Sequence, residues 1–113
     1  MNIKINTLTD KKEQLNATMN AKAFKELVGK EILIDGILLY TKEEIDNFSG
    51  EVKETRIGVV KVADDFYATN SSTICDNLES LHTFLGNECI GTKATVDKQN
   101  SKRGREFLVL KLK

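Results

Sequence analysis

The 113-residue sequence has no proline, no tryptophan and a single histidine, and aromatic residues make up only 6% of it. With no proline-rich linker, low-complexity tract or internal repeat, a chain of this length predicts one domain. No apolar run approaches the ~18 residues of a membrane span, and the N-terminus is too polar for a signal peptide. We therefore expect no association with membranes.

The two cysteines and the histidine do not form a recognisable catalytic or metal-binding motif. Cys75 and Cys89 lack the Cys-x-x-Cys spacing of zinc sites, so they are interpreted as buried thiols in a reducing compartment, the cytoplasm. His82 lies within an apolar periodic segment, which favours a structural role over general-base catalysis. Phosphate loops, nucleophile elbows and His-Glu metal motifs are also missing. The sequence predicts a protein that is not an enzyme and needs no cofactor or metal.

The formal net charge is zero, which argues against binding a polyanion by bulk positive charge. The charges are nevertheless segregated along the chain. Residues 62–92 carry five acidic side chains and no lysine or arginine, whereas residues 93–113 carry seven basic and two acidic side chains. The last segment therefore creates a local positive potential that the total conceals.

Apolar periodicity predicts five strands and one long helix. A run at 31–40 is apolar on both faces and interrupted by Gly36, which indicates a bend that lets one strand belong to two sheets. A polar loop is expected at 41–51 and a turn at Asp64-Asp65. The other strands are expected at 52–62, 66–69, 90–96 and 105–113, the last following a loop at 98–104.

Two helices are predicted from capping signals and helical spacing. Ile74, Leu78, Leu81 and Leu85 recur at helical intervals after a run of hydroxyl residues and before Gly86. A shorter helix is expected after Asn20, ending at Gly29. Residues 1–19 are weakly patterned, and we expect a flexible arm, a loose strand around Ile3 and Ile5, or disorder. Residues 20–113 then form the domain.

The predicted order is three strands, a helix and two strands. A helix between the third and fourth of five strands is the connectivity of the OB-fold, a partly open Greek-key barrel. The fold class is therefore expected to be mostly β, a five-stranded OB-fold barrel with an additional short N-terminal helix.

The last hairpin is the main candidate binding site. Its loop carries Lys98, Lys102 and Arg103, and Arg105 follows Gly104. In the final strand, Leu108, Leu110 and Leu112 share the face expected to meet the core. Phe107 shares the opposite face with the cations Arg105, Lys111 and Lys113. A ring flanked by cations suits a stacked base with neutralised phosphates beside it. The alternative is a solvated hairpin whose Phe107 is covered by the N-terminal helix.

Further candidate contacts come from elsewhere in the chain. Phe66 and Tyr67 are adjacent on a strand, so one ring should face the core, and we expect Tyr67 to be the exposed one. Packing of both rings is an equally open alternative. The remaining candidate DNA-binding residues are Tyr40, Lys53, Arg56 and Lys93, although the cations of the second strand lie on different faces.

Several segments together resemble the short single-stranded DNA-binding proteins of bacteriophages and related mobile elements. The similarity covers residues 29–112 and rests on Gly29-Lys30, Ser49–Lys53, Phe66–Thr69 followed by Ser71, and Ser101–Phe107, in that order. The resemblance implies an OB-fold that coats single-stranded DNA during replication, recombination or transfer in a bacterial host cell. It implies contacts from Tyr67, Lys102, Arg103, Arg105 and Phe107. The sequence departs from the resemblance in showing no acidic tail of the kind that recruits partner enzymes in bacterial homologues, so we do not expect such recruitment.

Two other readings remain open. An OB-fold module that binds another protein would use the basic hairpin to attract an acidic partner. An RNA-binding barrel of the cold-shock type is a weaker alternative, because the helix is long and aromatic residues are few. Self-association along DNA is also left open, through a free strand edge or the N-terminal arm.

Overall fold

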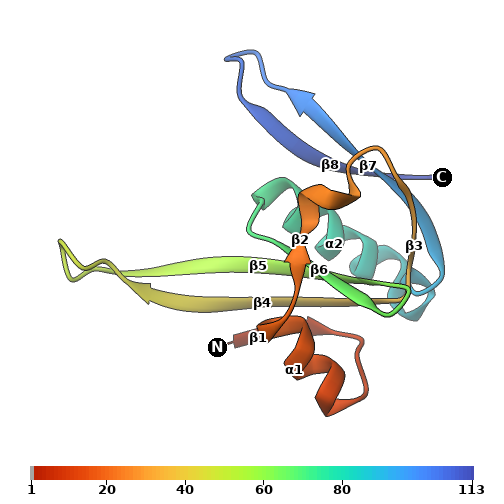
Figure 1. The fold of residues 1–113 in the computed structure, drawn as a ribbon, viewed down its shortest axis with the longest axis horizontal. Coiled ribbons are helices and arrows are strands. Elements are labelled where there is room, and N and C mark those ends of the chain that lie inside the picture. Colours follow the sequence, from red (N-terminus) through yellow and green to blue (C-terminus); the bar gives the residue numbers. More distant parts are fainter. Residues whose placement is uncertain (1) are drawn as a thin grey trace.

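The computed structural model describes residues 2–113, so that Met1 of the predicted arm lies outside the described residues. The strands are β1 (Asn2–Asn6), β2 (Lys22–Ala23), β3 (Glu31–Ile34), β4 (Gly36–Ile45), β5 (Val52–Val62), β6 (Asp65–Thr69), β7 (Thr92–Asn100) and β8 (Glu106–Leu112). The helices are α1 (Lys11–Met19) and α2 (Ser72–Leu85), with 3-10 turns η1 (Phe24–Leu27) and η2 (Gly86–Cys89). The fold is mostly β, as predicted. A five-stranded sheet has the order β1-β4-β5-β6-β2 and a three-stranded sheet has the order β3-β7-β8 (Figure 1).

The bend predicted at Gly36 is confirmed. Strand β3 pairs with β7 in the smaller sheet, and after Asp35 the chain enters β4, which pairs with β5 in the larger sheet. Gly36 is buried, and a Cβ at this position would lie 2.7 Å from Leu8 Cδ2. The glycine therefore allows the N-terminal segment to pack closely over the bend.

The two sheets do not close into a barrel within residues 2–113. Strand β6 pairs with β2 in parallel instead of meeting β8. Strand β8 consequently has a free edge, where the Leu110 N–H donates to Asn77 Oδ1 of α2 at 3.1 Å. An amide on the helix thus takes the place of a strand partner at this point, and the two sheets stay open along this edge of β8.

The N-terminal third differs most from the prediction. Of the alternatives for residues 1–19, the strand around Ile3 and Ile5 is the one observed, and it forms β1, which pairs with β4. The helix α1, whose first turn is capped by Asp10, was not predicted. The short helix predicted between Asn20 and Gly29 is confirmed only in part: β2 is extended, and the helical structure is limited to the 3-10 turn η1, in which Phe24 and Leu27 are buried. Pairing of Lys22 and Ala23 with β6 holds this backbone extended, so the helix cannot begin there.

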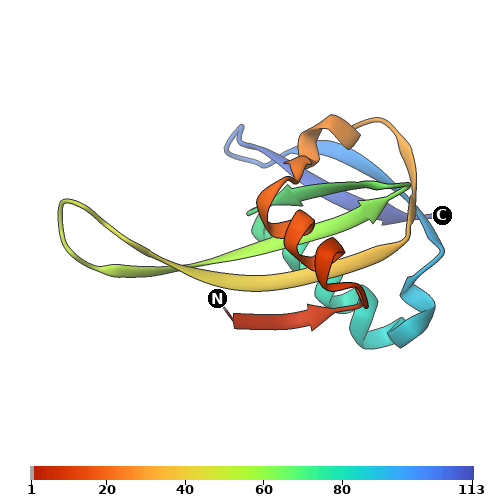
Figure 2. The ribbon, with the colours of Figure 1, turned by 60° about the horizontal axis from the view of Figure 1, so that its bottom comes forward.

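Several predicted boundaries also move. Strand β4 runs to Ile45, so the loop expected at 41–51 is shorter and the β4–β5 hairpin projects far from the body (Figure 2). Strand β7 runs from Thr92 to Asn100, which places Lys98 in a strand rather than a loop. The turn expected at Asp64-Asp65 lies one residue earlier, with Ala63 at a φ of 55°.

Helix α2 is confirmed, with Ser71 as its side-chain cap and Gly86 at its end. Its apolar face fills the main core between the sheets with Ile74, Leu78 and Leu81. A second, smaller core lies on the other side of the larger sheet, beneath α1, and consists of Leu8, Ala17, Leu38, Tyr40, Val59 and Phe66. No helix in residues 2–113 combines the length and the apolar character needed to cross a membrane.

Candidate nucleic-acid interface

The β7–β8 hairpin has a hydrogen-bonded turn that projects its basic residues beyond the core. Ser101 N–H donates to the Arg105 carbonyl at 2.8 Å, and Gly104 N–H donates to the Ser101 carbonyl at 2.9 Å. Ser101 Oγ accepts a third bond from Arg105 N–H at 3.2 Å. Gly104 has a φ of 80°, which suits glycine at the left-handed position of such a turn. The turn therefore holds its backbone in one arrangement while its side chains extend into solvent.

Three cations crowd this turn, and the described residues do not neutralise them. Lys102, Arg103 and Arg105 are all exposed, and none forms an ion pair with any residue in the range 2–113. Their charges are adjacent in space because they share one short turn. An unpaired cluster of this kind creates a local positive potential that favours an anionic ligand.

The register of the smaller sheet places Phe107 next to these cations on the face turned away from the core. Leu110 pairs with Val96, and both are buried in the main core. Alternation along the strand then puts Phe107 and Val109 on the opposite, outer face. Phe107 is partly buried and belongs to neither core cluster. The ring therefore retains accessible surface beside the basic turn.

The same outer face continues toward β3, with further lysines. Lys111 and Lys113 are exposed, but each forms an ion pair with an acidic residue of another strand of the same sheet, Lys111 with one on β7 and Lys113 with one on β3. Lys111 Nζ lies 3.3 Å from Asp97 Oδ2, and Lys113 Nζ lies 3.1 Å from Glu31 Oε2. Lys93 is exposed on this face and has no ion pair in the described chain. The positive potential is thus strongest at the turn and weaker along the sheet.

Sequence reasoning missed Asp97 and Glu31 as modulators of this surface. Both carboxylates come from strands that lie beside β8 or one strand further in the sheet. The β7–β8 register could have been inferred from the hairpin turn, which would have put Asp97 on the Phe107 face. The contribution of Glu31 requires knowledge of the β3–β7 pairing, in which Glu31 lies opposite Thr95, 64 positions further along the chain.

The other predicted contacts lie elsewhere. Lys98 is on the core-facing side of the hairpin and pairs with Glu106 at 3.1 Å. Lys53 is exposed on the β4–β5 hairpin. Tyr40 is only 6% exposed and packs in the second core, so it offers no face for stacking. None of these three side chains joins the surface around Phe107.

Arg56 and Tyr67 are occupied by contacts within the fold. Arg56 forms ion pairs with Asp76 at 2.7 Å and Glu79 at 3.5 Å, and donates to the Ser72 carbonyl. The hydrogen bond to Asp76 raises the pKa of Arg56 further, so that this cation ties β5 to the start of α2. Tyr67 is partly buried against the main core, and Lys22 Nζ lies 6.0 Å from the centre of its ring.

The outer face of the larger sheet is covered. Leu8 and Ala17 from the N-terminal segment pack on Leu38, Val59 and Phe66. Lys61 donates a hydrogen bond to Glu13 of α1, and this bond raises the pKa of Lys61. Phe66 is 8% exposed in the second core, and Tyr67 is partly buried against the main core. The alternative in which both rings pack is therefore the one observed, and the expectation of an exposed Tyr67 is wrong. The face of β5 and β6 is consequently closed to a ligand in this arrangement.

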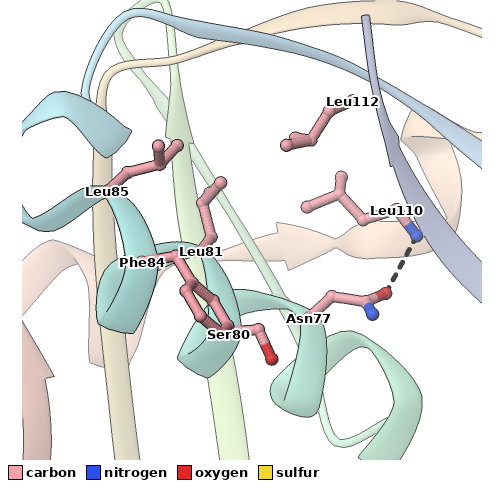
Figure 3. Close-up of a pocket in the computed structure, with 7 residues that line it drawn as sticks. All are labelled: Asn77, Ser80, Leu81, Phe84, Leu85, Leu110 and Leu112. Atoms are coloured by element: carbon pink, nitrogen blue, oxygen red, sulfur yellow. Dashed lines mark hydrogen bonds between the residues drawn. The ribbon is translucent and has the colours of Figure 1, made fainter.

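An apolar recess lies between α2 and β8, with a volume of about 290 Å³ (Figure 3). It is lined by Asn77, Ser80, Leu81, Phe84, Leu85, Leu110 and Leu112. It holds no cation and no titratable group, so it suits neither a phosphate nor acid–base chemistry.

No group of three His, Cys, Asp or Glu side chains within residues 2–113 is arranged to hold a metal ion. Burial raises the pKa of Cys75 and of Cys89, which disfavours reactive thiolates.

Comparison with family models, with curated proteins and with solved structures yields no match to this chain.

Proposed function

We propose that this protein binds single-stranded DNA without sequence preference, through the β7–β8 hairpin and the adjoining outer face of the smaller sheet. The observation that carries the proposal is the cluster of Lys102, Arg103 and Arg105, three unpaired cations beside a partly exposed Phe107. Proteins that bind single strands combine two elements: cations placed along the sugar-phosphate backbone of the DNA, and aromatic rings on which its bases stack.

We further propose that the fold is an open variant of the OB-fold. The order of β3/β4, β5, β6, α2, β7 and β8 supports this, as does a first strand that bends between two sheets. OB-folds bind oligonucleotides with the face of their second and third strands and with two loops, one of which joins the fourth and fifth strands. The corresponding face here lies beneath α1, so we assign binding to the loop between the fourth and fifth strands and to β8. The resemblance of residues 29–112 to single-stranded DNA-binding proteins of phages agrees with this assignment.

The proposal is tested by titrating labelled oligo-dT at several salt concentrations. Changing Lys102, Arg103 and Arg105 together to alanine should weaken binding at low salt by about tenfold or more. It should also reduce the slope of log K against log salt by about 2, since each phosphate contact on a single strand contributes roughly 0.7.

The matched control changes Lys11, Lys12 and Lys25 to alanine. These three lysines are exposed and form no ion pair within residues 2–113, and their removal alters the net charge by the same amount. Binding that depends on the hairpin should survive in the control. Equal losses in the two variants would reject the site, and no binding by the wild type would reject the function.

A further inference from the structure

The end of the β4–β5 hairpin exposes an apolar patch far from the body of the protein. Ile45 and Val52 are cross-strand partners, with 70% and 59% of their surface exposed, and Phe48 in the connecting loop is fully exposed. Figures 1 and 2 both show this hairpin extending well beyond the other elements. Three large apolar side chains gathered at a projecting tip indicate an interaction surface.

The loop that presents Phe48 is held by hydrogen bonds. Asp46 N–H donates to the Glu51 carbonyl at 2.9 Å, and Gly50 N–H donates to the Asp46 carbonyl at 2.8 Å. Asp46 Oδ1 also accepts from Phe48 N–H at 2.9 Å. The ring is therefore displayed from a defined loop rather than from a frayed end, which lowers the entropic cost of docking it.

The same face of the hairpin carries an unfavourable pair of like charges. Glu43 and Glu54 face each other across the strands, two residues along each strand from the Ile45–Val52 pair and therefore on the same side. Neither carboxylate forms an ion pair within residues 2–113, because Lys42 is bound to Glu44 on the other side. Like charges placed directly opposite destabilise a strand pair. A cationic partner would relieve this repulsion.

A surface of complementary chemistry exists on the same protein. Residues 42–54 hold five carboxylates and two lysines, whereas residues 98–106 hold four cations and one carboxylate. The first hairpin has an apolar patch flanked by acids, and the second has Phe107 and Val109 flanked by Arg103 and Arg105. No ion pair joins the two hairpins within residues 2–113 of one chain. The carboxylates of the first hairpin can therefore pair with the cations of the second hairpin on another copy.

We propose that the tip of the β4–β5 hairpin of one copy docks on the β7–β8 hairpin of a second copy. Ile45, Phe48 and Val52 would cover the apolar strip around Phe107, and the Glu43–Glu54 pair would meet the arginines. The contact joins two different surfaces, so each copy offers one donor and one acceptor for further copies. This inference concerns self-association. It uses the same arginines and the same Phe107 as the proposed DNA contact, so a hairpin that holds a second copy does not bind DNA at the same time.

The contact is tested by sedimentation velocity on the full chain over a range of protein and salt concentrations. Wild type should self-associate at low salt and dissociate as salt rises, because the charges at the contact are exposed. Glu43→Gln with Glu54→Gln should raise the dissociation constant about tenfold or more, whereas Glu26→Gln with Glu88→Gln, which removes two exposed carboxylates elsewhere, should not. Ile45→Ser with Val52→Ser tests the apolar part at sites that contribute nothing to either core.

A mixing experiment separates this contact from any other mode of association. The variant with Glu43→Gln and Glu54→Gln keeps its basic hairpin, and a second variant with Arg103→Ala and Arg105→Ala keeps its acidic one. Each should be monomeric alone, and an equimolar mixture should form dimers through one intact contact. Because the chain has no tryptophan, Phe48→Trp adds a single reporter whose emission should shift to the blue on association.

Two results would overturn the proposal: wild type that is monomeric at low salt up to about 1 mM, or a mixture that stays monomeric while wild type associates. The variant lacking Glu43 and Glu54 should still bind oligo-dT. A failure of self-association is thereby distinguished from a failure of the proposed DNA binding.

Discussion

The outer faces of the two sheets differ in how far other segments cover them. On the larger sheet, the N-terminal segment from Leu8 to Ala17 covers Leu38, Val59 and Phe66 and builds a second core. On the smaller sheet, the outer face is left to lysines, Thr95 and the Phe107–Val109 strip, and its residues are exposed or partly exposed. The outer face of the larger sheet therefore contributes to the stability of the fold, whereas the outer face of the smaller sheet stays accessible to solvent.

The largest effect is expected when a leucine of the covered face and a leucine of the open face are each changed to alanine and the free energies of unfolding are compared. Leu38 is 1% exposed beneath α1, so Leu38→Ala should lower the free energy of unfolding by about 2–5 kcal/mol through lost burial and a residual cavity. Leu33 lies on the open face of the smaller sheet and is 44% exposed. Leu33→Ala makes the same chemical change there and should cost less than about 1 kcal/mol. Urea unfolding of both variants measures the difference, and similar losses would mean that the open face is also packed.

The elements that the sequence predicted correctly are those whose signals lie within a short segment of the chain. Helix α2 was predictable because its apolar residues recur at helical spacing between a serine cap and a glycine. The bend at Gly36 was predictable because a strand apolar on both faces, interrupted by glycine, has few other solutions. These signals are local, and local signals were sufficient for the order of the elements from β3 to β8.

The cover over the larger sheet was not predictable in this way. Helix α1 buries little beyond Ala17, so its sequence has almost no amphipathic pattern. The apolar outer-face residues Leu38 and Tyr40 were attributed to a strand shared between sheets, although α1 is what shields them. Their burial depends on a tertiary contact with a segment more than 20 residues away, which periodicity within either segment does not reveal.

Of the residues predicted as DNA contacts, those of the last hairpin lie together in the structure, and Tyr40, Lys53, Arg56 and Tyr67 lie elsewhere. The basic turn and Phe107 follow from residues adjacent in the chain. Arg56 and Tyr40 also have suitable chemistry, but the first is bound by Asp76 and the second is packed beneath the N-terminal segment. Assigning them correctly requires the neighbours that the fold supplies.

The next effect in size concerns the affinity for oligo-dT and the ring of Phe107 on the open face of the smaller sheet. Phe107→Ala should weaken oligo-dT binding by about 1–3 kcal/mol if one base stacks there, while leaving the salt slope unchanged because stacking carries no charge. Phe84→Ala removes another ring, 84% exposed on α2 and outside the basic surface, and should leave affinity unchanged. Equal effects from both variants, measured by fluorescence anisotropy, would exclude stacking on Phe107.

The smallest effect concerns the two sides of the β7–β8 hairpin. Asp97→Asn frees Lys111 on the Phe107 face, and Glu106→Gln frees Lys98 on the core-facing side, so each variant removes one carboxylate and releases one lysine. Both ion pairs are solvent-exposed and are worth at most about 1 kcal/mol, so neither change should alter the melting temperature appreciably. If DNA lies across the outer face, Asp97→Asn should increase oligo-dT affinity by up to about fivefold at low salt and steepen the salt dependence. Glu106→Gln should have a smaller effect, because Lys98 points to the other side. Equal gains in the two variants would mean that the strand responds to the total charge of the hairpin and not to one of its faces.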